Sequence, residues 1–509
     1  MRFTVKRKLV TIFSGLITGL IGYLFLLTNI LNNQDNLHFM HGYGIGITSG
    51  RWLLTLLGDT METIFGNLNL QTFNDILCIC ILAVAAYIIV LIFDLHDLLH
   101  CGIWSAMFIS FPSIGDTLLF SFTSHYYAAA ILMTVTGVYL TIKYKFGFLA
   151  GAFLAACSLG IYQAYFPLMI GLFLTLLIIR SISEDTTFIS LLKSGFLYLG
   201  TLILGLIDYF ILLRISLFAC NSSLSNYQNI SSMGKLDIRE IPKILSSAYK
   251  SFLKIPFDDY CDMGASNNWI IRVMLYILII ASFYMLVLII RKRKEVFKQT
   301  RWLFLVLILL YPLAISSIIL MCYHAYIHTL MIYGIVLIYL MPVALCEQGC
   351  LGEDKPLSQN RAKWCKKTVA AALIIITLIY YRQNNASYSL LYYANQQSYN
   401  YWNSLVTQIK NTEGFRADMP WAIIGSVDDP LYNNPWDEYV EQYGAIPANQ
   451  LNMITRRNYV EQFLGYHPVY AEGFEILKIK TSSYYKKMPC YPDYGSIRIE
   501  NNTVVVKFS

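Results

Sequence analysis

Charge is scarce in this chain. Asp, Glu, Lys and Arg together make up 14% of the 509 residues, whereas hydrophobic residues make up 56%. Soluble domains carry about 25% charged residues, so the composition excludes a soluble globular protein as a description of the whole chain. The net charge of +7 does not indicate nucleic-acid binding, because most basic clusters stand between apolar runs, where they orient a membrane protein.

Several functional signatures are missing as well. The chain has no internal repeat, and Cys346 and Cys350 lack the second Cys or His pair that a zinc site needs. The glycine-rich stretch Gly42-Tyr43-Gly44-Ile45-Gly46 does not follow a strand, so it is not a dinucleotide fingerprint. No strand–helix alternation indicates a nucleotide-binding domain. We therefore expect no metal and no cofactor, and no place for a nucleotide-sugar donor on the inner side.

Long apolar runs dominate what is present. A membrane-spanning helix needs about 20 apolar residues, and the first run lacks the small-x-small cleavage site of a signal peptide. The sequence predicts an α-helical polytopic membrane protein whose residues 1–382 form a bundle of about 11 transmembrane helices. The expected spans cover residues 9–31, 76–93, 98–111, 126–142, 147–162, 166–179, 194–219, 269–290, 303–321, 330–345 and 368–381.

The loops between these runs predict an orientation. Basic residues precede the first run and fill every inner loop except the first, which is rich in Asp and His. The positive-inside rule then places the N-terminus in the cytoplasm, and an odd number of spans places the C-terminus outside. The first outer loop covers residues 32–73, and its residues 51–66 have the pattern of a helix lying in the membrane interface.

Two further stretches depart from simple spans. Phe111-Pro112 interrupts the third run and predicts a short span followed by a re-entrant or interfacial segment. Residues 383–509 have soluble composition and predict a small extracytoplasmic α/β domain. Within it we expect a helix over 388–410, a buried strand over 421–427 and a hairpin that turns at Asn501-Asn502.

Asp35 is the leading candidate for chemistry. It lies within about one helical turn of the first span and is followed by His38, His41 and Arg51. An acid so close to the membrane is costly unless it is paired or used. A transferase that uses a phosphate-linked donor needs a base for the acceptor hydroxyl and a cation for the leaving phosphate. The alternative is a solvated loop acid.

Other candidates lie at the outer ends of later spans. Asp116 and His125 flank the next outer-facing break, where a helix cap with interfacial aromatics is the alternative interpretation. Tyr162 and Gln163 occupy a short turn at which Gln163 either binds a sugar or caps a helix. Arg214, late in the seventh span, could hold a lipid phosphate. A donor linked to a lipid and reached from the bilayer fits these positions.

The chain resembles the bacterial glucosyltransferases typified by the type II O-antigen glucosyltransferases, of the GT-C class. The resemblance rests on Asp35-Asn36-Leu37, the glycine-rich stretch to Ser49-Gly50-Arg51-Trp52, Phe111-Pro112, and Gly160-Ile161-Tyr162-Gln163. It covers about residues 8–385 and a similar strand in the tail. The family often has two adjacent acids where this chain has Asp35-Asn36, which leaves Asp116 as a candidate for the second carboxylate.

The resemblance implies a polyprenyl-phosphate sugar as donor and a surface glycan as acceptor, on the outer face of the bacterial inner membrane. It also implies partnership with a donor synthase and a flippase. The leading hypothesis is therefore an inverting, metal-independent hexosyltransferase, with glucose as the favoured sugar. Asp35 would act as base, Arg51, His38, His125 and Arg214 would bind phosphate, and Tyr162 and Gln163 would contact sugar.

Two alternatives stay open. A non-enzymatic transporter or flippase of a lipid-linked glycan should have charges deep within several spans and repeat-related halves. The middles of the spans are nearly free of charge here, with Arg214 as the exception. A membrane acyltransferase should have a histidine embedded in a span, whereas the histidines of this chain cluster at span ends.

Overall fold

The computed structural model describes most of the chain: residues 2–183, 186–225, 239–255, 268–322, 327–350, 356–427 and 453–508. The chain divides into two compact units. The helical unit comprises Met1–Ile30 and His41–Ala386, and the C-terminal unit comprises Leu31–Met40 and Ser387–Ser509. The expected first outer loop, 32–73, is therefore shared between the two units.

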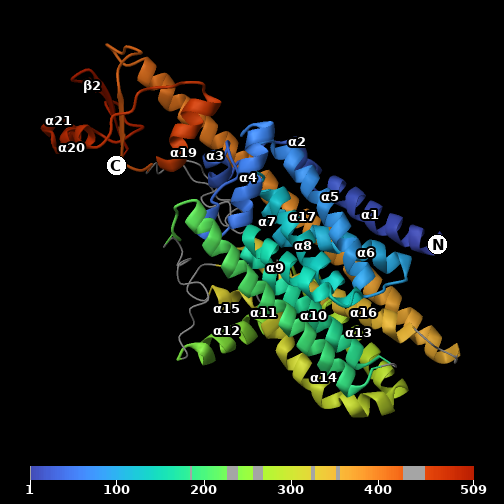
Figure 1. Ribbon diagram of the computed structural model, residues 1–509. Helices are drawn as coiled ribbons and strands as arrows, with labels where there is room; N and C mark the ends of the chain where they lie inside the picture. The colour runs from blue at the N-terminus through green and yellow to red at the C-terminus, as the bar shows by residue number, and fades with distance from the viewer. Residues whose placement is uncertain are drawn as a thin grey trace. The chain divides into compact units, whose positions relative to one another are not determined.

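The helical unit is a bundle dominated by long helices (Figure 1). Its elements are α1 (Arg2–Gly22), α2 (Leu24–Thr28), η1 (Ile47–Ser49), α4 (Trp52–Phe65), α5 (Gln71–Ile92), α6 (Leu98–Ser110), α7 (Pro112–Leu118), α8 (Ser124–Lys143), α9 (Gly147–Ile161), η2 (Gln163–Tyr165), α10 (Phe166–Ser181), α11 (Phe188–Ala219), α12 (Ile241–Lys254), α13 (Trp269–Lys292), α14 (Lys294–Ile315), α15 (Ile318–Met321), η4 (Thr329–Val336), α16 (Leu337–Cys350) and the first part of α17 (Pro356–Lys410).

Among the described residues, seven helices are long and apolar enough to cross a membrane, or eight if the bent pair α6 and α7 is one span. The predicted membrane character is thus confirmed, whereas the predicted count of eleven is not. Several expected spans are short: α9 has 15 residues and so rises only about 22 Å, against a hydrocarbon core of about 30 Å. The expected span at 9–31 is divided at Tyr23 between α1 and α2.

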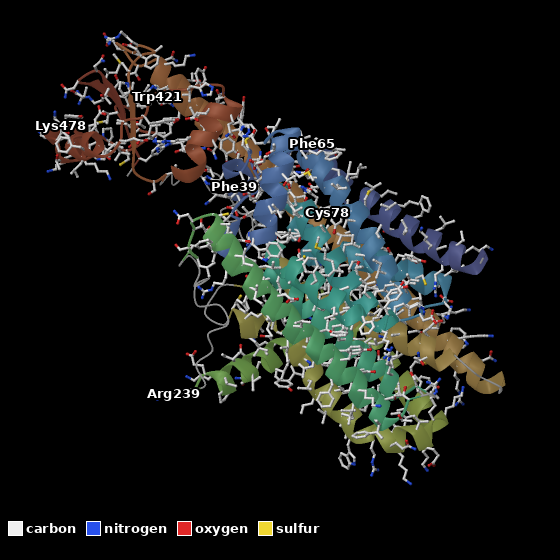
Figure 2. The ribbon with its side chains drawn as sticks, viewed as in Figure 1. Phe39, Phe65, Cys78, Arg239, Trp421 and Lys478 are labelled. Atoms are coloured by element: carbon white, nitrogen blue, oxygen red, sulfur yellow. The ribbon has the colours of Figure 1, made fainter. Side chains whose placement is uncertain are left out.

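The helices differ in how much of their surface other helices cover. The apolar window of α10 is 89% buried, whereas that of α14 is 22% buried. Large apolar side chains such as Phe196 on α11 and Ile280 on α13 are exposed. An apolar surface of this extent is stable when lipid rather than water covers it. The sticks in Figure 2 place Cys78 of α5 inside the bundle, where it is fully buried.

The expected break at Phe111-Pro112 is present. Helices α6 and α7 meet there at a bend of 50°, and Pro112 is the first residue of α7, where its missing N–H costs no hydrogen bond. At the ends of α6 and α1, two backbone carbonyls accept hydrogen bonds from asparagine side chains of α17. The Asn384 amide donates to the Ser110 carbonyl at 3.2 Å, and the Asn385 amide donates to the Gly22 carbonyl at 2.5 Å.

Small residues allow the central helices to pack closely. A Cβ added at Gly151 of α9 would lie 2.8 Å from the carbonyl oxygen of Gly137 on α8. Nearby, the hydroxyl groups of Thr134 and Ser158 hydrogen-bond to each other at 2.8 Å between the same helices. Close backbone approach at small residues is a main source of helix association in lipid.

The C-terminal unit contains a three-stranded sheet packed on the last part of α17. The strands are β1 (Trp421–Ile424), β2 (Ile497–Glu500) and β3 (Thr503–Lys507), in the order β1-β3-β2. Its other elements are α3 (Gln34–His38), α19 (Met453–Asn458), the π-helix η5 (Tyr459–Phe463), α20 (Phe474–Thr481) and α21 (Ser483–Lys487). Strand β1 is parallel to β3, and β2 is antiparallel to it.

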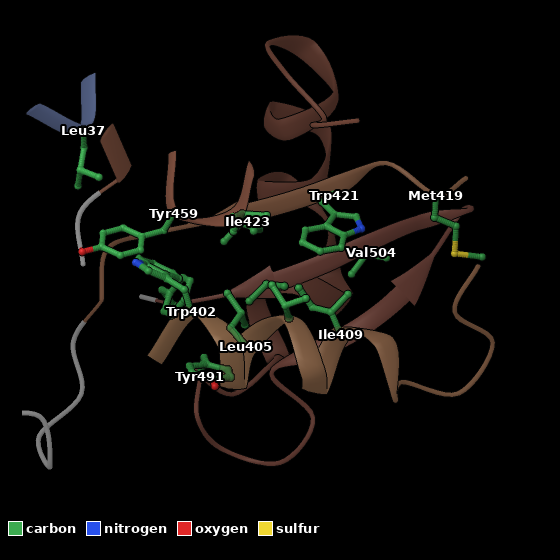
Figure 3. Packing of buried hydrophobic residues seen from close by; sticks show 14 residues of the cluster. Leu37, Trp402, Leu405, Ile409, Met419, Trp421, Ile423, Tyr459, Tyr491 and Val504 are labelled. Carbon is green, nitrogen blue, oxygen red and sulfur yellow. The ribbon is translucent and has the colours of Figure 1, made fainter. Parts of the chain in front are cut away.

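The sequence predicted the hairpin and the buried strand of this sheet. Asn501 and Asn502 both have positive φ, at 48° and 61°, as a tight hairpin turn requires. All four residues of β1 are buried. Figure 3 shows the core between helix and sheet, where Trp402, Leu405 and Ile409 of α17 face the strands. Helix α17 is continuous from Pro356 to Lys410, so the last predicted span and the helix predicted over 388–410 are parts of one helix.

The close contact between α8 and α9 can be tested at Gly151. We expect Gly151→Ala to destabilise the protein by about 1–3 kcal/mol, because the new Cβ overpacks against backbone. The matched control is Gly200→Ala on α11, where nothing lies within 4 Å of the added Cβ and better helix propensity should stabilise by up to about 1 kcal/mol. Thermal unfolding in detergent measures both. Equal melting temperatures for the two variants would contradict this packing.

Candidate functional site

Asp35 lies on a short helix of the C-terminal unit. Helix α3 spans Gln34–His38 and is capped by Asn33, whose side chain accepts the backbone N–H of Asn36 at 2.7 Å. Leu37 is fully buried, Asp35 is half-buried and His38 is exposed. Residues three apart are neighbours on a helix surface. The structure therefore places Asp35 and His38 on adjoining, accessible positions of one turn.

The C-terminal unit holds the Asp35 helix by polar and apolar contacts. The backbone N–H of Asn32 donates to Oδ1 of Asn395, whose Nδ2 donates to the Asn32 carbonyl, both at 2.9 Å. Nδ2 of Asn458 donates to the Leu37 carbonyl at 2.6 Å. The Leu37 side chain belongs to the same hydrophobic core as Tyr459 (Figure 3). These partners are more than 350 residues away in sequence, so no local pattern predicts them.

Arg51 lies at the start of α4 in the helical unit, against two tyrosines. Its guanidinium carbon is 4.9 Å from the ring centre of Tyr162 and 6.0 Å from that of Tyr127. The two tyrosine rings are stacked at 4.3 Å with 11° between their planes. A guanidinium at such distances is attracted by the ring quadrupole. Nε of Arg51 is buried and has no hydrogen-bond partner among the described residues.

Gln163 and Tyr209 hold the loop that carries Arg51. Nε2 of Gln163 donates to the Ser49 carbonyl at 3.0 Å and to the Tyr209 hydroxyl at 3.2 Å. The Tyr209 hydroxyl donates in turn to the Gly50 carbonyl at 3.1 Å. Gly50 has φ 77°, and a Cβ there would lie 2.7 Å from the Tyr209 hydroxyl, so a side chain is excluded for two reasons.

Trp52 and Gly160, which belong to the same two motifs as Arg51 and Gln163, also contact each other. Trp52 packs on Gly160 so closely that an added Cβ would lie 2.5 Å from its ring. The stretches Ser49-Gly50-Arg51-Trp52 and Gly160-Ile161-Tyr162-Gln163, more than 100 residues apart, thus pack on each other through Trp52, Arg51 and the Gln163 amide. The predicted site residues Arg51, Tyr162 and Gln163 form one cluster of the helical unit, which we call the Arg51 cluster.

Asp116 has a different environment. It is fully buried on α7, and its Oδ2 accepts the backbone N–H of Leu330 at 2.8 Å. Leu330 is near the start of η4, where helical N–H groups have no partner within the helix. The neighbouring Ser113 hydroxyl donates to the Thr329 carbonyl at 2.7 Å. This geometry favours the capping interpretation of Asp116.

His125 and Arg214 are the other predicted phosphate-binding residues of the helical unit. His125 is in the first turn of α8 with its ring centre 4.0 Å from that of Tyr126. Nδ1 of His125 is buried without a hydrogen-bond partner among the described residues. Arg214 lies on α11 and is exposed.

Sequence analysis missed a buried acid, Asp75. It lies in the first turns of α5, is 3% exposed, and accepts a hydrogen bond from the Ser124 hydroxyl at 2.7 Å. Ser124 directly precedes His125. Its place in the sequence could have identified it, because Asp75 directly precedes the expected span at 76–93. An acidic residue at or within a membrane span indicates a functional site. Asp75 thus joins Asp116 and Glu347 as a buried acid of the helical unit.

The loop contacts of Gln163 can be tested by hydrogen exchange. Gln163→Leu removes the donor of two buried hydrogen bonds, each of which should cost about 1–3 kcal/mol when its partner stays buried. We expect amide exchange in Ile47–Arg51 to become about 5- to 150-fold faster, as mass spectrometry of that peptide would measure. Peptides of the β2–β3 hairpin serve as the internal control. Unchanged exchange in Ile47–Arg51 would show that Gln163 does not hold this loop.

Comparison with known proteins gives one family. The model of the family described as Glucosyl transferase GtrII matches residues 24–339. The match includes the Asp35 helix, the Arg51 cluster and Asp116. Comparisons with curated proteins and with solved structures gave no match.

Proposed function

The chain belongs to the GtrII glucosyl transferase family, and from this premise we propose that it transfers a glucosyl residue from a polyprenyl-phosphate donor to a surface glycan. Transfer takes place on the outer face of the bacterial inner membrane, with the N-terminus in the cytoplasm and the C-terminus outside. The basic residues between the apolar runs support this orientation.

The Arg51 cluster carries the proposal. A guanidinium is held against stacked tyrosines on the Gly50–Arg51 turn, and its buried Nε has no partner among the described residues. A guanidinium suits phosphate because its planar fork donates two parallel hydrogen bonds. Arg51 binds the donor phosphate and stabilises the charge that develops on it as the sugar leaves. Gln163 acts as a positioning residue, because its amide is used to hold the Arg51 loop.

Asp35 serves as the general base. It takes the proton of the acceptor hydroxyl, the acceptor oxygen bonds to the anomeric carbon, and the bond from that carbon to the phosphate oxygen breaks. Polyprenyl phosphate leaves with the electron pair. We assign His38, on the same helical turn, to help neutralise charge on the phosphate, and His125 and Arg214 are further candidates for that task. Asp116 accepts the Leu330 N–H at the start of η4, so we assign it a capping role, and a role as the second carboxylate is the alternative.

Support for Asp35 comes from the way its helix is held. A catalytic base must keep its position relative to the substrate, and α3 is anchored by the Asn395 amide, by the Asn458 amide and by the burial of Leu37. Asp35 itself is only half-buried. A helix with these anchors holds a short acidic segment in place better than a free loop would.

We expect Asp35→Asn to lower the transfer rate by about 10²–10⁴-fold, the usual contribution of a general base. The assay uses membranes that contain the full-length protein, a polyprenyl-phosphate glucose donor and the surface glycan. The control is Asp418→Asn, an exposed acid of the C-terminal unit that pairs with Arg416 and should leave the rate unchanged. Full activity of Asp35→Asn would remove Asp35 from the reaction. Donor binding without transfer by the unmodified protein would favour a transporter instead.

Arg51→Lys separates the shape of the guanidinium from its charge. Lysine keeps the charge but loses the fork and most of the stacking, so we expect the KM for the lipid donor to rise by about 10- to 100-fold, as one charge-assisted hydrogen bond would predict. The control is Arg301→Lys, since Arg301 is an exposed arginine 5.3 Å from the Trp302 ring. An unchanged KM for Arg51→Lys would exclude bidentate phosphate binding.

A further inference from the structure

A buried arginine of the C-terminal unit has no ion-pair or hydrogen-bond partner for its side chain in the part of the chain that the structure describes. Arg456 lies on α19 and is 6% exposed. No ion pair or hydrogen bond of its side chain is found among the described residues, and its Nε is buried. Burial lowers the pKa of Arg456 to about 10, so the guanidinium is still charged at neutral pH. A buried charge without a partner costs several kcal/mol.

The groups around Arg456 suit an anion. Tyr470 and Arg457 both act electrostatically on Arg456. The Arg457 guanidinium lies 4.4 Å from the Tyr470 ring centre and pairs with Glu472 at 2.6 Å. The Tyr470 hydroxyl is buried without a hydrogen-bond partner among the described residues. Arg457 thus contacts Tyr470, and Arg456 is its neighbour in the chain. Of the two arginines, only Arg457 has an ion pair with an acid among the described residues.

Acids nearby do not neutralise Arg456. Glu461 of η5 is the other charged group that faces Tyr470, yet no ion pair joins it to either arginine within the described part of the chain. Burial raises the pKa of Tyr470 to about 12, so its hydroxyl keeps its proton and is available as a donor. The Arg456 side chain and the Tyr470 hydroxyl thus keep donors that no acceptor among the described residues uses.

We propose that Arg456 and the Tyr470 hydroxyl form a binding site for a phosphate group in the C-terminal unit. The guanidinium donates two hydrogen bonds to one phosphate group, as its geometry favours, and the tyrosine hydroxyl donates a third. Bound phosphate supplies the countercharge that the described protein groups do not. The proposed site belongs to the C-terminal unit, whereas the Arg51 cluster belongs to the helical unit.

The position of α19 links this site to Asp35. Helix α19 packs on α3, and Asn458, two residues after Arg456, donates to the Leu37 carbonyl. Phosphate bound at Arg456 would therefore stabilise the helix that also anchors Asp35. This link to catalysis rests on the proposed function, whereas phosphate binding itself does not. The phosphate belongs either to the lipid carrier or to a soluble phosphate compound, which share the same recognition chemistry.

The test measures thermal unfolding of the full-length protein in detergent with inorganic phosphate and with chloride at equal ionic strength. Specific binding to the folded state raises the melting temperature in a saturable way. We expect such a rise in the unmodified protein and its loss in Arg456→Met. Without phosphate, Arg456→Met should melt at the same or a higher temperature, because it removes a buried unpaired charge.

Two further variants complete the test. Arg498→Met is the matched control, since Arg498 is a half-exposed arginine of β2 that pairs with Glu500, and it should keep the full response to phosphate. Tyr470→Phe removes only the hydroxyl and should weaken phosphate binding by about 5-fold, the effect of one hydrogen bond. A full response in Arg456→Met, or a response lost equally in Arg498→Met, would overturn the proposal.

The source of the phosphate is resolved in lipid nanodiscs of phosphatidylcholine with and without polyprenyl monophosphate. Stabilisation by polyprenyl monophosphate that depends on Arg456 identifies the lipid carrier, and a response to inorganic phosphate alone identifies a soluble ligand. No response to either phosphate source overturns the site. Because these measurements need no transfer, loss of activity in Asp35→Asn leaves their outcome unaffected, and failure of the phosphate site leaves the transfer assay intact.

Discussion

Unpaired backbone groups at helix breaks are the constraint on which this structure depends. In lipid, each open N–H or C=O group must find a partner within the protein. The Asn384 and Asn385 amides of α17 bind the open carbonyls of Ser110 and Gly22, and the Asp116 carboxylate binds an open N–H of η4. The helices can therefore end, bend and restart inside an apolar bundle, which a run of simple spans could not do.

The same principle shapes the site. The turn before α4 exposes the Ser49 and Gly50 carbonyls, and Gln163 and Tyr209 satisfy them from two other helical elements. This arrangement brings Arg51 against Tyr162 and keeps it there without an acidic partner among the residues described. A cation held by aromatic rings rather than by a carboxylate retains its attraction for a phosphate. The hydrogen bonds that satisfy the backbone of this turn thus also position Arg51 for the proposed glucosyl transfer.

Acidic and basic residues with buried polar atoms and no ion pair among the described residues occur in both units, and their cost bears on function. Arg51 and Arg456 each have a buried Nε without a hydrogen bond among the described residues, and Asp75 is a buried acid whose described partner is a hydroxyl group. Such groups reduce stability unless a ligand compensates them. The C-terminal unit contains both Arg456 and the Asp35 helix. On this argument it takes part in the function of the protein.

Local sequence patterns determined the membrane class, the break at Phe111-Pro112, the hairpin at Asn501-Asn502 and the candidates Asp35 and Arg51. Apolar run length, proline geometry and turn propensity act over a few residues, so they can be read from sequence. Tertiary structure alone decided that Asp35 belongs with the C-terminal unit, that Asp116 caps η4, and that Arg456 is buried. Each of these three outcomes depends on residues that are far apart in the sequence and pack or hydrogen-bond with each other in the fold. The pair Asn32 and Asn395 illustrates this. Such pairings are set by packing of the whole chain, because residues hundreds of positions apart carry no shared local signal.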